Sequence, residues 1–227
     1  MEIDFKKYPL PKRMRHHSSP NLYLPFSELK VASDYYPPVY EKINWGELFE
    51  NGCQPDLLDI GTGKGAFLLD CSEQEPDRNI LGLELRLQPV RWLEDVIRGE
   101  GIGNCAVLWY SVANGLPFID DASLEKVFYL FPDPWFKKKH FKRRAFNEAL
   151  LSEIRRVLKP GGELYLASDV KEVHDYHIAV LKSTNLFMFE EIASDVDWRL
   201  PPTNKEKFCK LKNIPYFRLK CCKRLTL

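Results

Sequence analysis

The sequence lacks the features that mark membrane-spanning and secreted proteins. No run of about 18 apolar residues is present to span a bilayer, and the start, MEIDFKKYPLPKRMRHH, is too polar for a secretory leader. The six cysteines include no CxxC pair. From these absences we expect a reduced, cytoplasmic protein without a membrane contact, rather than a disulfide framework.

Net charge is nearly absent as well. The chain has 227 residues and a formal charge of +1, yet residues 137–144 hold six Lys or Arg and no acid, which leaves 27 basic against 32 acidic residues elsewhere. A basic strip on a slightly acidic body attracts a polyanion locally. Nucleic acid is therefore a candidate partner.

No internal repeat or low-complexity tract divides the chain, and its length suits one domain. Residues 1–35 carry scattered Pro, Ser and basic residues, which predicts an irregular basic arm on the surface. From residue 36 onward, short apolar runs alternate with amphipathic stretches, as in βαβ units. We therefore expect an α/β protein in which residues 36–227 form one domain around a Rossmann-like, seven-stranded, mostly parallel sheet with helices on both faces.

The apolar periodicity locates the expected elements. Strands are predicted at 56–60, 79–85, 106–110, 126–131 and 163–168, followed by two that are antiparallel to each other at 187–192 and 216–225. Helices are predicted at 65–75, 87–99, 141–158 and 171–184. The third helix is the best supported, because apolar residues mark one face and the KPGG sequence at 159–162 ends it.

A glycine loop follows the first predicted strand. The stretch DIGTGKGAF places Gly61, Gly63 and Gly65 at the start of a helix, where a tight turn requires unusual φ values and a ligand approaches bare backbone. The spacing also fits a relaxed dinucleotide fingerprint. An NAD-dependent dehydrogenase is therefore one alternative.

Two carboxylates near this loop favour a different ligand. Asp59 stands two residues before the first glycine, and Glu84 ends the next strand, where an acid that binds a ribose is expected. A carboxylate at Asp59 repels a pyrophosphate but attracts the amino group and sulfonium of S-adenosylmethionine. The pattern resembles the first motif of the class I methyltransferases. A loop cap at Asp59 and a plain surface acid at Glu84 are the alternatives.

The stretch FPDPWFKKKHFKRR, at 131–144, predicts a site for RNA. Asp133 follows the fourth strand, at the edge where open α/β sheets bind ligands, and Pro132 and Pro134 stiffen the backbone around it. Trp135 offers a flat surface on which a base can stack. Clustered at a helix N-terminus, the cations would oppose the helix dipole, which favours phosphate contacts over a solvated face. These cations are Lys137, Lys138, Lys139, Lys142, Arg143 and Arg144, the last three expected in or near the first turn of the third helix.

Together with DIGTGKG, the acid of LGLEL, the SD of LYLASD and the TNKE sequence at 203–206, this stretch closely resembles the bacterial tRNA (guanine-N7-)-methyltransferases over roughly residues 56–219. The resemblance implies an enzyme that moves a methyl group from S-adenosylmethionine to N7 of the guanosine at position 46 in the tRNA variable loop. No metal is expected, and the protein is expected to be a monomer or homodimer.

The motifs and the resemblance together predict the site residues. Asp133 is expected closest to the chemistry. The residues predicted at the methyl donor are Asp59, Gly61, Gly63, Glu84, Ser111 and Val112. Those predicted at the tRNA are Trp135, Lys137, Lys138, Lys139, Arg143, Asp169, Thr203 and Glu206, with Lys12, Arg13 and Arg15 of the arm nearby. Ser111 stands where the family has an acid for the donor's adenine, so an uncharged, weaker contact is expected there, with Asn114 as a substitute.

Two further functions stay open at the level of sequence. One is a class I methyltransferase for a protein or small molecule, in which the basic strip is incidental. The other is a catalytically weak RNA-binding module on the same fold, which only the serine at position 111 favours. His174 and His177, three residues apart, are expected to be solvated on a helix surface rather than to bind a metal.

Overall fold

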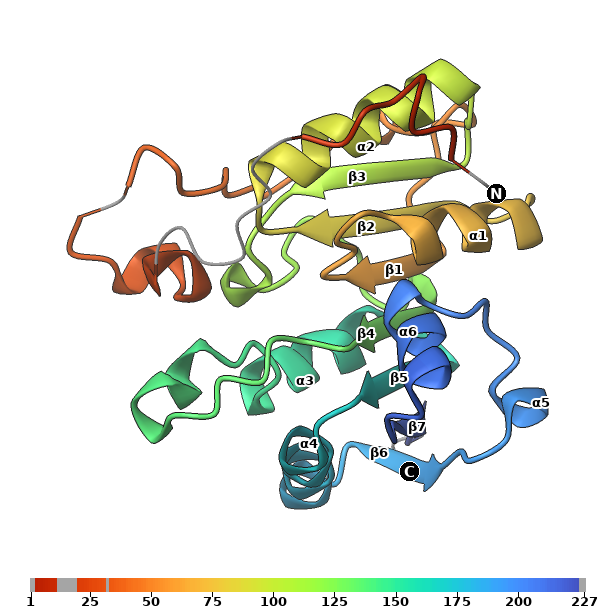
Figure 1. The fold of residues 1–227 in the computed structure, drawn as a ribbon. Helices are drawn as coiled ribbons and strands as arrows, with labels where there is room; N and C mark the ends of the chain where they lie inside the picture. Colours follow the sequence, from red (N-terminus) through yellow and green to blue (C-terminus); the bar gives the residue numbers. More distant parts are fainter. Residues whose placement is uncertain (1–2, 12–19, 32, 225–227) are drawn as a thin grey trace.

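The computed structural model describes residues 3–11, 20–31 and 33–224 (Figure 1). Its centre is one sheet of seven strands in the order β3-β2-β1-β4-β5-β7-β6. The first five strands in this order pair in parallel, and β7 is antiparallel to both of its neighbours. The strands are Leu57–Ile60 (β1), Ile80–Glu84 (β2), Cys105–Trp109 (β3), Leu124–Leu130 (β4), Leu158–Ser168 (β5), Phe187–Glu191 (β6) and Phe217–Lys223 (β7). The predicted Rossmann-like sheet, with its antiparallel last pair, is confirmed.

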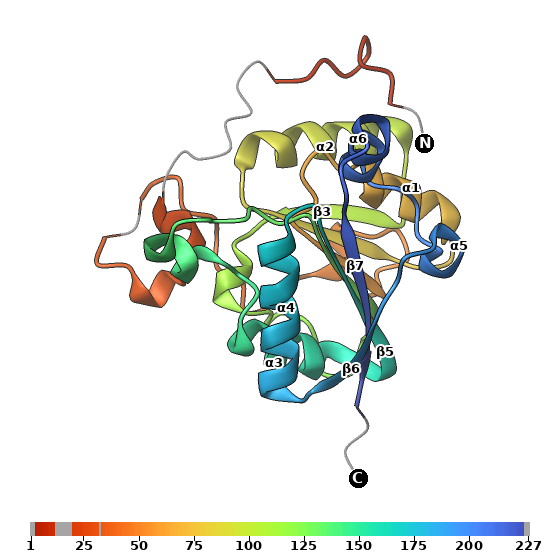
Figure 2. The same ribbon diagram turned by 60° about the horizontal axis from the view of Figure 1, so that its bottom comes forward.

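Helices cover both faces of this sheet (Figure 2). Successive strand residues point to opposite faces. In β1, Leu57 packs in one core cluster with α1 and α2, whereas Leu58 and Ile60 pack in the other with α3 and α4. The helices are Ala66–Gln74 (α1), Leu87–Glu100 (α2), Glu148–Val157 (α3), Lys171–Thr184 (α4), Asp195–Trp198 (α5) and Asn204–Lys212 (α6). The sequence pattern did not predict α5 and α6, which lie between β6 and β7.

Helix α3 begins later than predicted. Asn147 lies in extended backbone and its side chain accepts a hydrogen bond from the backbone N–H of Leu150, which starts the helix at Glu148. The residues before this cap form the short 3-10 helix Lys138–Arg143 (η5). The prediction that Lys142, Arg143 and Arg144 lie at the first turn of the long helix was therefore wrong. The argument from the helix dipole does not apply to them.

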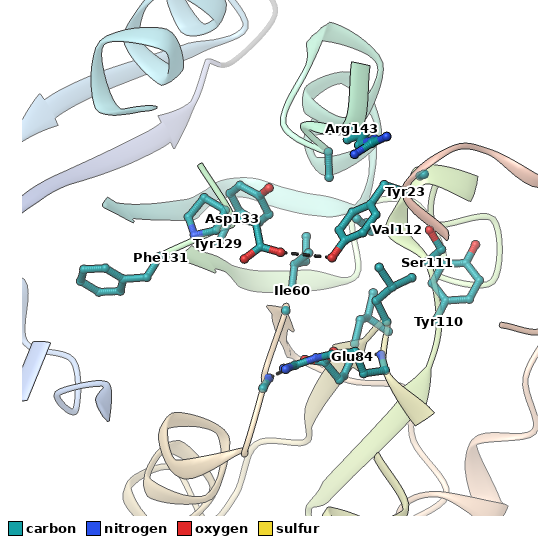
Figure 3. Close-up of a pocket in the computed structure, with 18 of the residues that line it drawn as sticks. Tyr23, Ile60, Glu84, Tyr110, Ser111, Val112, Tyr129, Phe131, Asp133 and Arg143 are labelled. Carbon is teal, nitrogen blue, oxygen red and sulfur yellow. Dashed lines mark hydrogen bonds and ion pairs between the residues drawn. The ribbon is translucent and has the colours of Figure 1, made fainter. Parts of the chain in front are cut away.

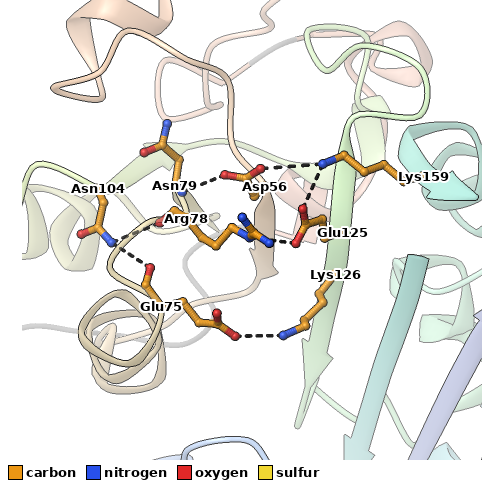
Figure 4. Close-up of polar contacts among 8 residues, drawn as sticks. All are labelled: Asp56, Glu75, Arg78, Asn79, Asn104, Glu125, Lys126 and Lys159. Atoms are coloured by element: carbon orange, nitrogen blue, oxygen red, sulfur yellow. Dashed lines mark hydrogen bonds and ion pairs between the residues drawn. The ribbon is translucent and has the colours of Figure 1, made fainter. Parts of the chain in front are cut away.

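The amino edge of the sheet is closed by charges that pair with one another (Figure 4). Arg78 Nε donates to Glu125 Oε2 at 2.9 Å, and Lys159 Nζ lies 3.1 Å from the other oxygen of Glu125. On the same edge, Lys126 Nζ lies 3.0 Å from Glu75 Oε1. The predicted site residues gather at the opposite, carboxyl edge. None of the described helices combines the length and apolar character needed to cross a membrane.

Candidate active site

A cavity of about 290 Å³ lies at the carboxyl ends of β1 to β4. Figure 3 shows Glu84, Ser111 and Asp133 around it; Glu84 is the last residue of β2, and Ser111 and Asp133 follow β3 and β4. Residues predicted at the methyl donor therefore share one cavity with residues predicted at the tRNA. The predicted residues that line it are Gly61, Gly63, Glu84, Ser111, Val112, Asp133, Trp135 and Arg143.

A second cavity, of about 610 Å³, adjoins the first, because Gly61, Gly63 and Arg86 line both. Its wall includes Asp59 and Thr203. The start of α6 thus borders the glycine loop, as the predicted role of residues 203–206 requires. The structure places Asp59 in the second cavity and Asp133 in the first, with the glycine loop shared between them.

The glycine loop depends on backbone that only glycine adopts easily. Gly61, Gly63 and Gly65 have φ values of 84°, 60° and 72°, all in the left-handed region. A Cβ atom on Gly65 would lie 2.4 Å from a methyl carbon of Leu93, so this residue lets α1 start directly against α2. At Gly61, an added Cβ would meet nothing within 4 Å, so the backbone there is open to a ligand.

The carboxyl group of Asp59 is buried and lacks a cationic partner in the described part of the chain. Asp59 is only 4% exposed. Burial raises the pKa of Asp59 to about 7, against the effect of the nearby Thr62 hydroxyl and with a further contribution from the negative charge of Glu84. A buried carboxylate without a protein cation fits a ligand that brings its own positive charge, as S-adenosylmethionine does.

Glu84 is also buried, but its oxygens already accept several hydrogen bonds. The backbone N–H of Gly63 donates to Oε2 at 2.9 Å, which draws the glycine loop toward the end of β2. Arg86 donates to Oε1 from its backbone N–H at 2.9 Å and from Nε at 2.8 Å. Arg86 is therefore the cation with which any further hydrogen-bond donor at Glu84 competes.

Asp133 is held in a loop whose backbone is strained on both sides. Phe131 and Trp135 have φ values of 53° and 43°, which bulky residues rarely adopt, and proline fixes φ at positions 132 and 134, on either side of Asp133. Such conformations persist where surrounding contacts hold them, and they concentrate at functional sites. Phe131 N donates to the carbonyl oxygen of Ala167 at 2.8 Å, which anchors the start of the loop to β5.

The Trp135 ring is part of a small aromatic and cationic stack. Arg143 lies over it, with 5.0 Å between the guanidinium carbon and the ring centroid. Tyr23 and His140 form T-shaped pairs with it at centroid distances of 4.8 and 5.7 Å. The predicted stacking surface thus lies in the wall of the cavity, already paired with one of the predicted phosphate-binding cations.

The described side chains among the remaining cations of the strip point either to solvent or into the protein. Lys137 and Lys142 are exposed. Arg144 is turned inward: its Nη2 donates to the carbonyl oxygen of Pro134 at 3.0 Å, and its guanidinium lies over the rings of Phe141 and Tyr176. Arg144 therefore braces the loop. The side chains of Lys138 and Lys139, and residues Lys12, Arg13 and Arg15, lie outside what the structure describes.

Lys137, Asp169 and Glu206 are predicted residues that line neither cavity. Asp169 forms an ion pair with Lys205 at 2.7 Å, and Lys205 lines the second cavity. Glu206 is fully buried and accepts from Arg218 Nη2 at 2.8 Å and from the backbone N–H of Thr203 at 2.7 Å. With Thr203 it forms a capping box, which starts α6.

Ser111 and Asn114 contact the protein's own N-terminal part. Ser111 Oγ donates to the carbonyl oxygen of Leu22 at 2.9 Å, which leaves its lone pairs as acceptors. Asn114 Oδ1 accepts from the backbone N–H of Phe26 at 2.7 Å. These contacts bring Tyr23 into the cavity. Tyr23 and Arg86 are site residues that the sequence pattern missed, since no local motif marks a tyrosine 110 residues from Asp133.

The two histidines of α4 are buried, so the prediction that they are solvated was wrong. His174 stacks on Phe217 with 4.9 Å between the ring centroids. Burial lowers the pKa of His177 to about 3, so it stays neutral against the ring of Phe146. Over the described ranges, His, Cys, Asp and Glu side chains form no group of three or more that could hold a metal ion.

The chain is similar to known methyltransferases along most of its length. A family model described as "Putative methyltransferase" matches residues 53–217. A tRNA (guanine-N(7)-)-methyltransferase of Parasynechococcus marenigrum is 38% identical over 184 residues, which cover 77% of this chain and 77% of that protein. One of Candida glabrata is 35% identical over 78% of this chain and 67% of its own length.

Solved structures share the fold at low sequence identity. The precorrin-6y C5,15-methyltransferase of Geobacter metallireducens matches with a TM-score of 0.53 at 16% identity, covering 75% of this chain and 81% of that one. A 30S ribosomal A1408 methyltransferase from an uncultured bacterium gives 0.51 at 18%, covering 77% and 90%. The predicted class I methyltransferase fold is confirmed.

Proposed function

Because the chain belongs to the tRNA (guanine-N(7)-)-methyltransferase family, we propose that it moves the methyl group of S-adenosylmethionine to N7 of guanosine 46 in the variable loop of tRNA. It does so in the cytoplasm, as a monomer or homodimer and without a metal. The observation that carries this proposal is the single cavity shared by Glu84, Ser111, Asp133 and Trp135.

The two adjoining cavities suit the two ends of the methyl donor. Glu84 and Ser111 in the first can accept hydrogen bonds from ribose hydroxyls and from the adenine amino group. Asp59 in the second can pair with the donor's positive charge. The open backbone at Gly61 lies between them. When bound, the donor supplies an electrophilic methyl carbon next to its sulfonium sulfur.

Asp133 has an electrostatic role in this proposal. N7 of neutral guanine carries a lone pair and no proton, so no general base is needed. Methylation places positive charge on the guanine ring, and a carboxylate that accepts hydrogen bonds from the guanine edge stabilises that charge. The strained loop fixes Asp133 before the tRNA arrives, and alignment of the reacting atoms supplies the rest of the rate.

The basic strip and the N-terminal arm position the tRNA. Exposed Lys137 and Lys142 can contact phosphates, which orient the substrate without reading its sequence. The guanosine is engaged in folded tRNA, so its base has to be extruded before it enters the cavity. Residues 36–227 act in this proposal as one catalytic domain, with the arm 1–35 as an addition that reaches both the cavity and the tRNA.

The test is incubation of unmodified bulk tRNA with methyl-labelled donor, followed by mapping of the modified nucleoside. We expect 7-methylguanosine at position 46. In Asp133→Asn, transfer should slow by about 100-fold while donor affinity changes less than about twofold. The exposed Asp120→Asn variant is the control. Label in another nucleoside, or unchanged transfer in Asp133→Asn, contradicts the proposal.

A further inference from the structure

We propose that Tyr23 is a positioning residue for Asp133, and that Ser111 and Asn114 hold in place the N-terminal segment that carries it. The N-terminal segment here means residues 20–31. This inference rests on the proposed function, because it assigns Tyr23 a role through the carboxylate that faces the guanine. It also gives Ser111 a task besides any contact with the donor.

The contact between Tyr23 and Asp133 is direct. The Tyr23 hydroxyl donates to Oδ2 of Asp133 at 3.1 Å, across the cavity drawn in Figure 3. Among the described residues, no other donor contacts this carboxylate. A hydrogen bond to one oxygen fixes the rotation of the group, so the second oxygen keeps a constant direction for a ligand. Burial and the charge of Asp133 both raise the pKa of Tyr23, so the hydroxyl keeps its proton at neutral pH.

The ring of Tyr23 is fixed as well as its hydroxyl. It forms a T-shaped pair with Trp135, with an interplanar angle of 79° and 4.8 Å between the centroids. Trp135 in turn carries Arg143 over its ring. A change in the position of Tyr23 therefore alters its contacts with both Asp133 and Trp135.

The N-terminal segment is held by contacts to one short loop after β3. Leu22 is only 4% exposed, and its carbonyl oxygen accepts from Ser111 Oγ at 2.9 Å. Asn114 Oδ1 accepts from Phe26 N at 2.7 Å. Tyr36 closes the arrangement, because its hydroxyl donates to the carbonyl oxygen of Leu24 at 2.7 Å and accepts from Asn114 Nδ2 at 3.0 Å. Tyr23 lies between two anchored residues, 22 and 24.

A donated hydrogen bond that only fixes an acid has a distinct kinetic signature. Its removal slows the chemical step but leaves both binding steps nearly unchanged. Removal of this hydrogen bond has no effect once the acid has been substituted. The effects of two substitutions are not additive when both groups act through one interaction. A purely structural tyrosine would slow transfer by the same factor whether or not Asp133 is present.

The experiment compares Tyr23→Phe with Tyr35→Phe, a tyrosine of the same region that is 74% exposed. Single-turnover methyl transfer is measured with saturating S-adenosylmethionine and unmodified tRNA. Tyr23→Phe should slow transfer by about 10- to 50-fold, with less than about a twofold change in either affinity. Tyr35→Phe should match the wild type. A Tyr23→Phe rate equal to or faster than wild type overturns the proposal, and a faster rate would mean that Tyr23 obstructs the acid.

Two double variants complete the test. In an Asp133→Asn background, Tyr23→Phe should slow transfer by less than about twofold. If Tyr23→Phe slows transfer in that background by as much as it does alone, a role through Asp133 is contradicted. Asn114→Ala should slow transfer by itself and add nothing to Tyr23→Phe, and additive losses overturn the anchoring role. If the wild type places no label in tRNA, the proposed function fails and this inference fails with it. A wild type that methylates tRNA with a normal Tyr23→Phe rate refutes the inference alone.

Discussion

At the scale of single residues, the donor contact proposed for Asp59 is linked to the stability of the protein. Its carboxyl group is buried without a protein cation, and burial raises its pKa to about 7 from an ordinary value of 3.8. The folded, donor-free protein therefore prefers the protonated form, whereas a positively charged donor prefers the carboxylate. The same group thus opposes folding at alkaline pH and favours ligand binding there.

Asp59→Asn should make the donor-free protein more stable at pH 8 and weaken its affinity for S-adenosylmethionine. Because the folded pKa lies above the unfolded value, the wild type loses stability as pH rises from about 4 to 7, and the variant lacks that loss. We expect the variant to gain about 1 to 3 kcal/mol in the free energy of unfolding at pH 8, and nothing at pH 4. Urea denaturation at several pH values measures the gain.

Calorimetric titration with S-adenosylmethionine measures the predicted loss of donor affinity. Affinity in the Asp59→Asn variant should fall by about tenfold or more at pH 8. The exposed Asp77→Asn variant should behave as wild type in both measurements. A stability difference that does not vary with pH would mean that the pKa of Asp59 is not raised.

At the scale of elements, the loop 131–144 depends on one inward cation. Arg144 donates to the carbonyl oxygen of Pro134 and lies over two rings, so it connects the end of the loop to the strained turn around Asp133. Neighbouring Lys142 is exposed. Two cations of one basic run, two residues apart, therefore differ: one lies inside the loop and the other faces solvent.

Arg144→Ala should destabilise the loop, and Lys142→Ala should not. Loss of a charged hydrogen bond in a half-buried setting costs about 1 to 3 kcal/mol. We expect faster amide hydrogen exchange at 131–144 and slower methyl transfer in Arg144→Ala. In Lys142→Ala, exchange should be unchanged and only tRNA affinity should fall. Equal exchange in both variants would show that Arg144 does not brace the loop.

The apolar periodicity of the sequence predicts the elements that bury one face in the core. Strands β1 to β5 and helix α4 follow from apolar runs, because burial on a sheet face or helix face requires them. The start of α3 was missed because Phe141, Ala145 and Phe146 continue a helical pattern through residues that are 3-10 or extended. That the helix begins at Glu148, after the cap at Asn147, is seen only in the structure. Helix α6 was missed because the residues after its N-cap Thr203 form the polar run NKEKFCKLK, which has no clear apolar periodicity.

The candidate site was predictable where a motif carries it. Glu84 ends β2 and Asp133 follows β4, so both lie at the carboxyl edge of the sheet, as the sequence predicts. Tyr23 belongs to an irregular segment without periodicity, and its place depends on hydrogen bonds to a loop about 90 residues away in sequence. Such contacts leave no local trace. The inward turn of Arg144 is likewise decided by tertiary packing, not by the basic run itself.

At the scale of the whole molecule, charge is divided between two ends of the sheet. At the amino edge acids and bases pair with one another (Figure 4). At the carboxyl edge, exposed lysines follow the Asp133 turn. An anionic RNA is drawn toward the edge where cations face solvent, and each phosphate contact releases counterions.

Lys137→Glu combined with Lys142→Glu should weaken tRNA binding and flatten its dependence on salt. The slope of log affinity against log salt concentration should fall by about 1 to 2. The matched control reverses Arg98 and Lys182, in the last turns of α2 and α4. The control slope should equal that of wild type. Equal slopes for the two double variants would place the tRNA elsewhere on the molecule.

The hydrogen bond between Tyr23 and Asp133 also has a consequence for biosynthesis. Tyr23 leaves the ribosome long before Asp133 and before the loop at 111–114 that anchors it. The early residues must therefore wait, undocked, until β3, β4 and the turn beyond them have been made and folded. If Tyr23 and Asp133 have the roles proposed above, a nascent chain with a complete sheet but with residues 20–31 still undocked would bind the methyl donor and would be slow to transfer its methyl group.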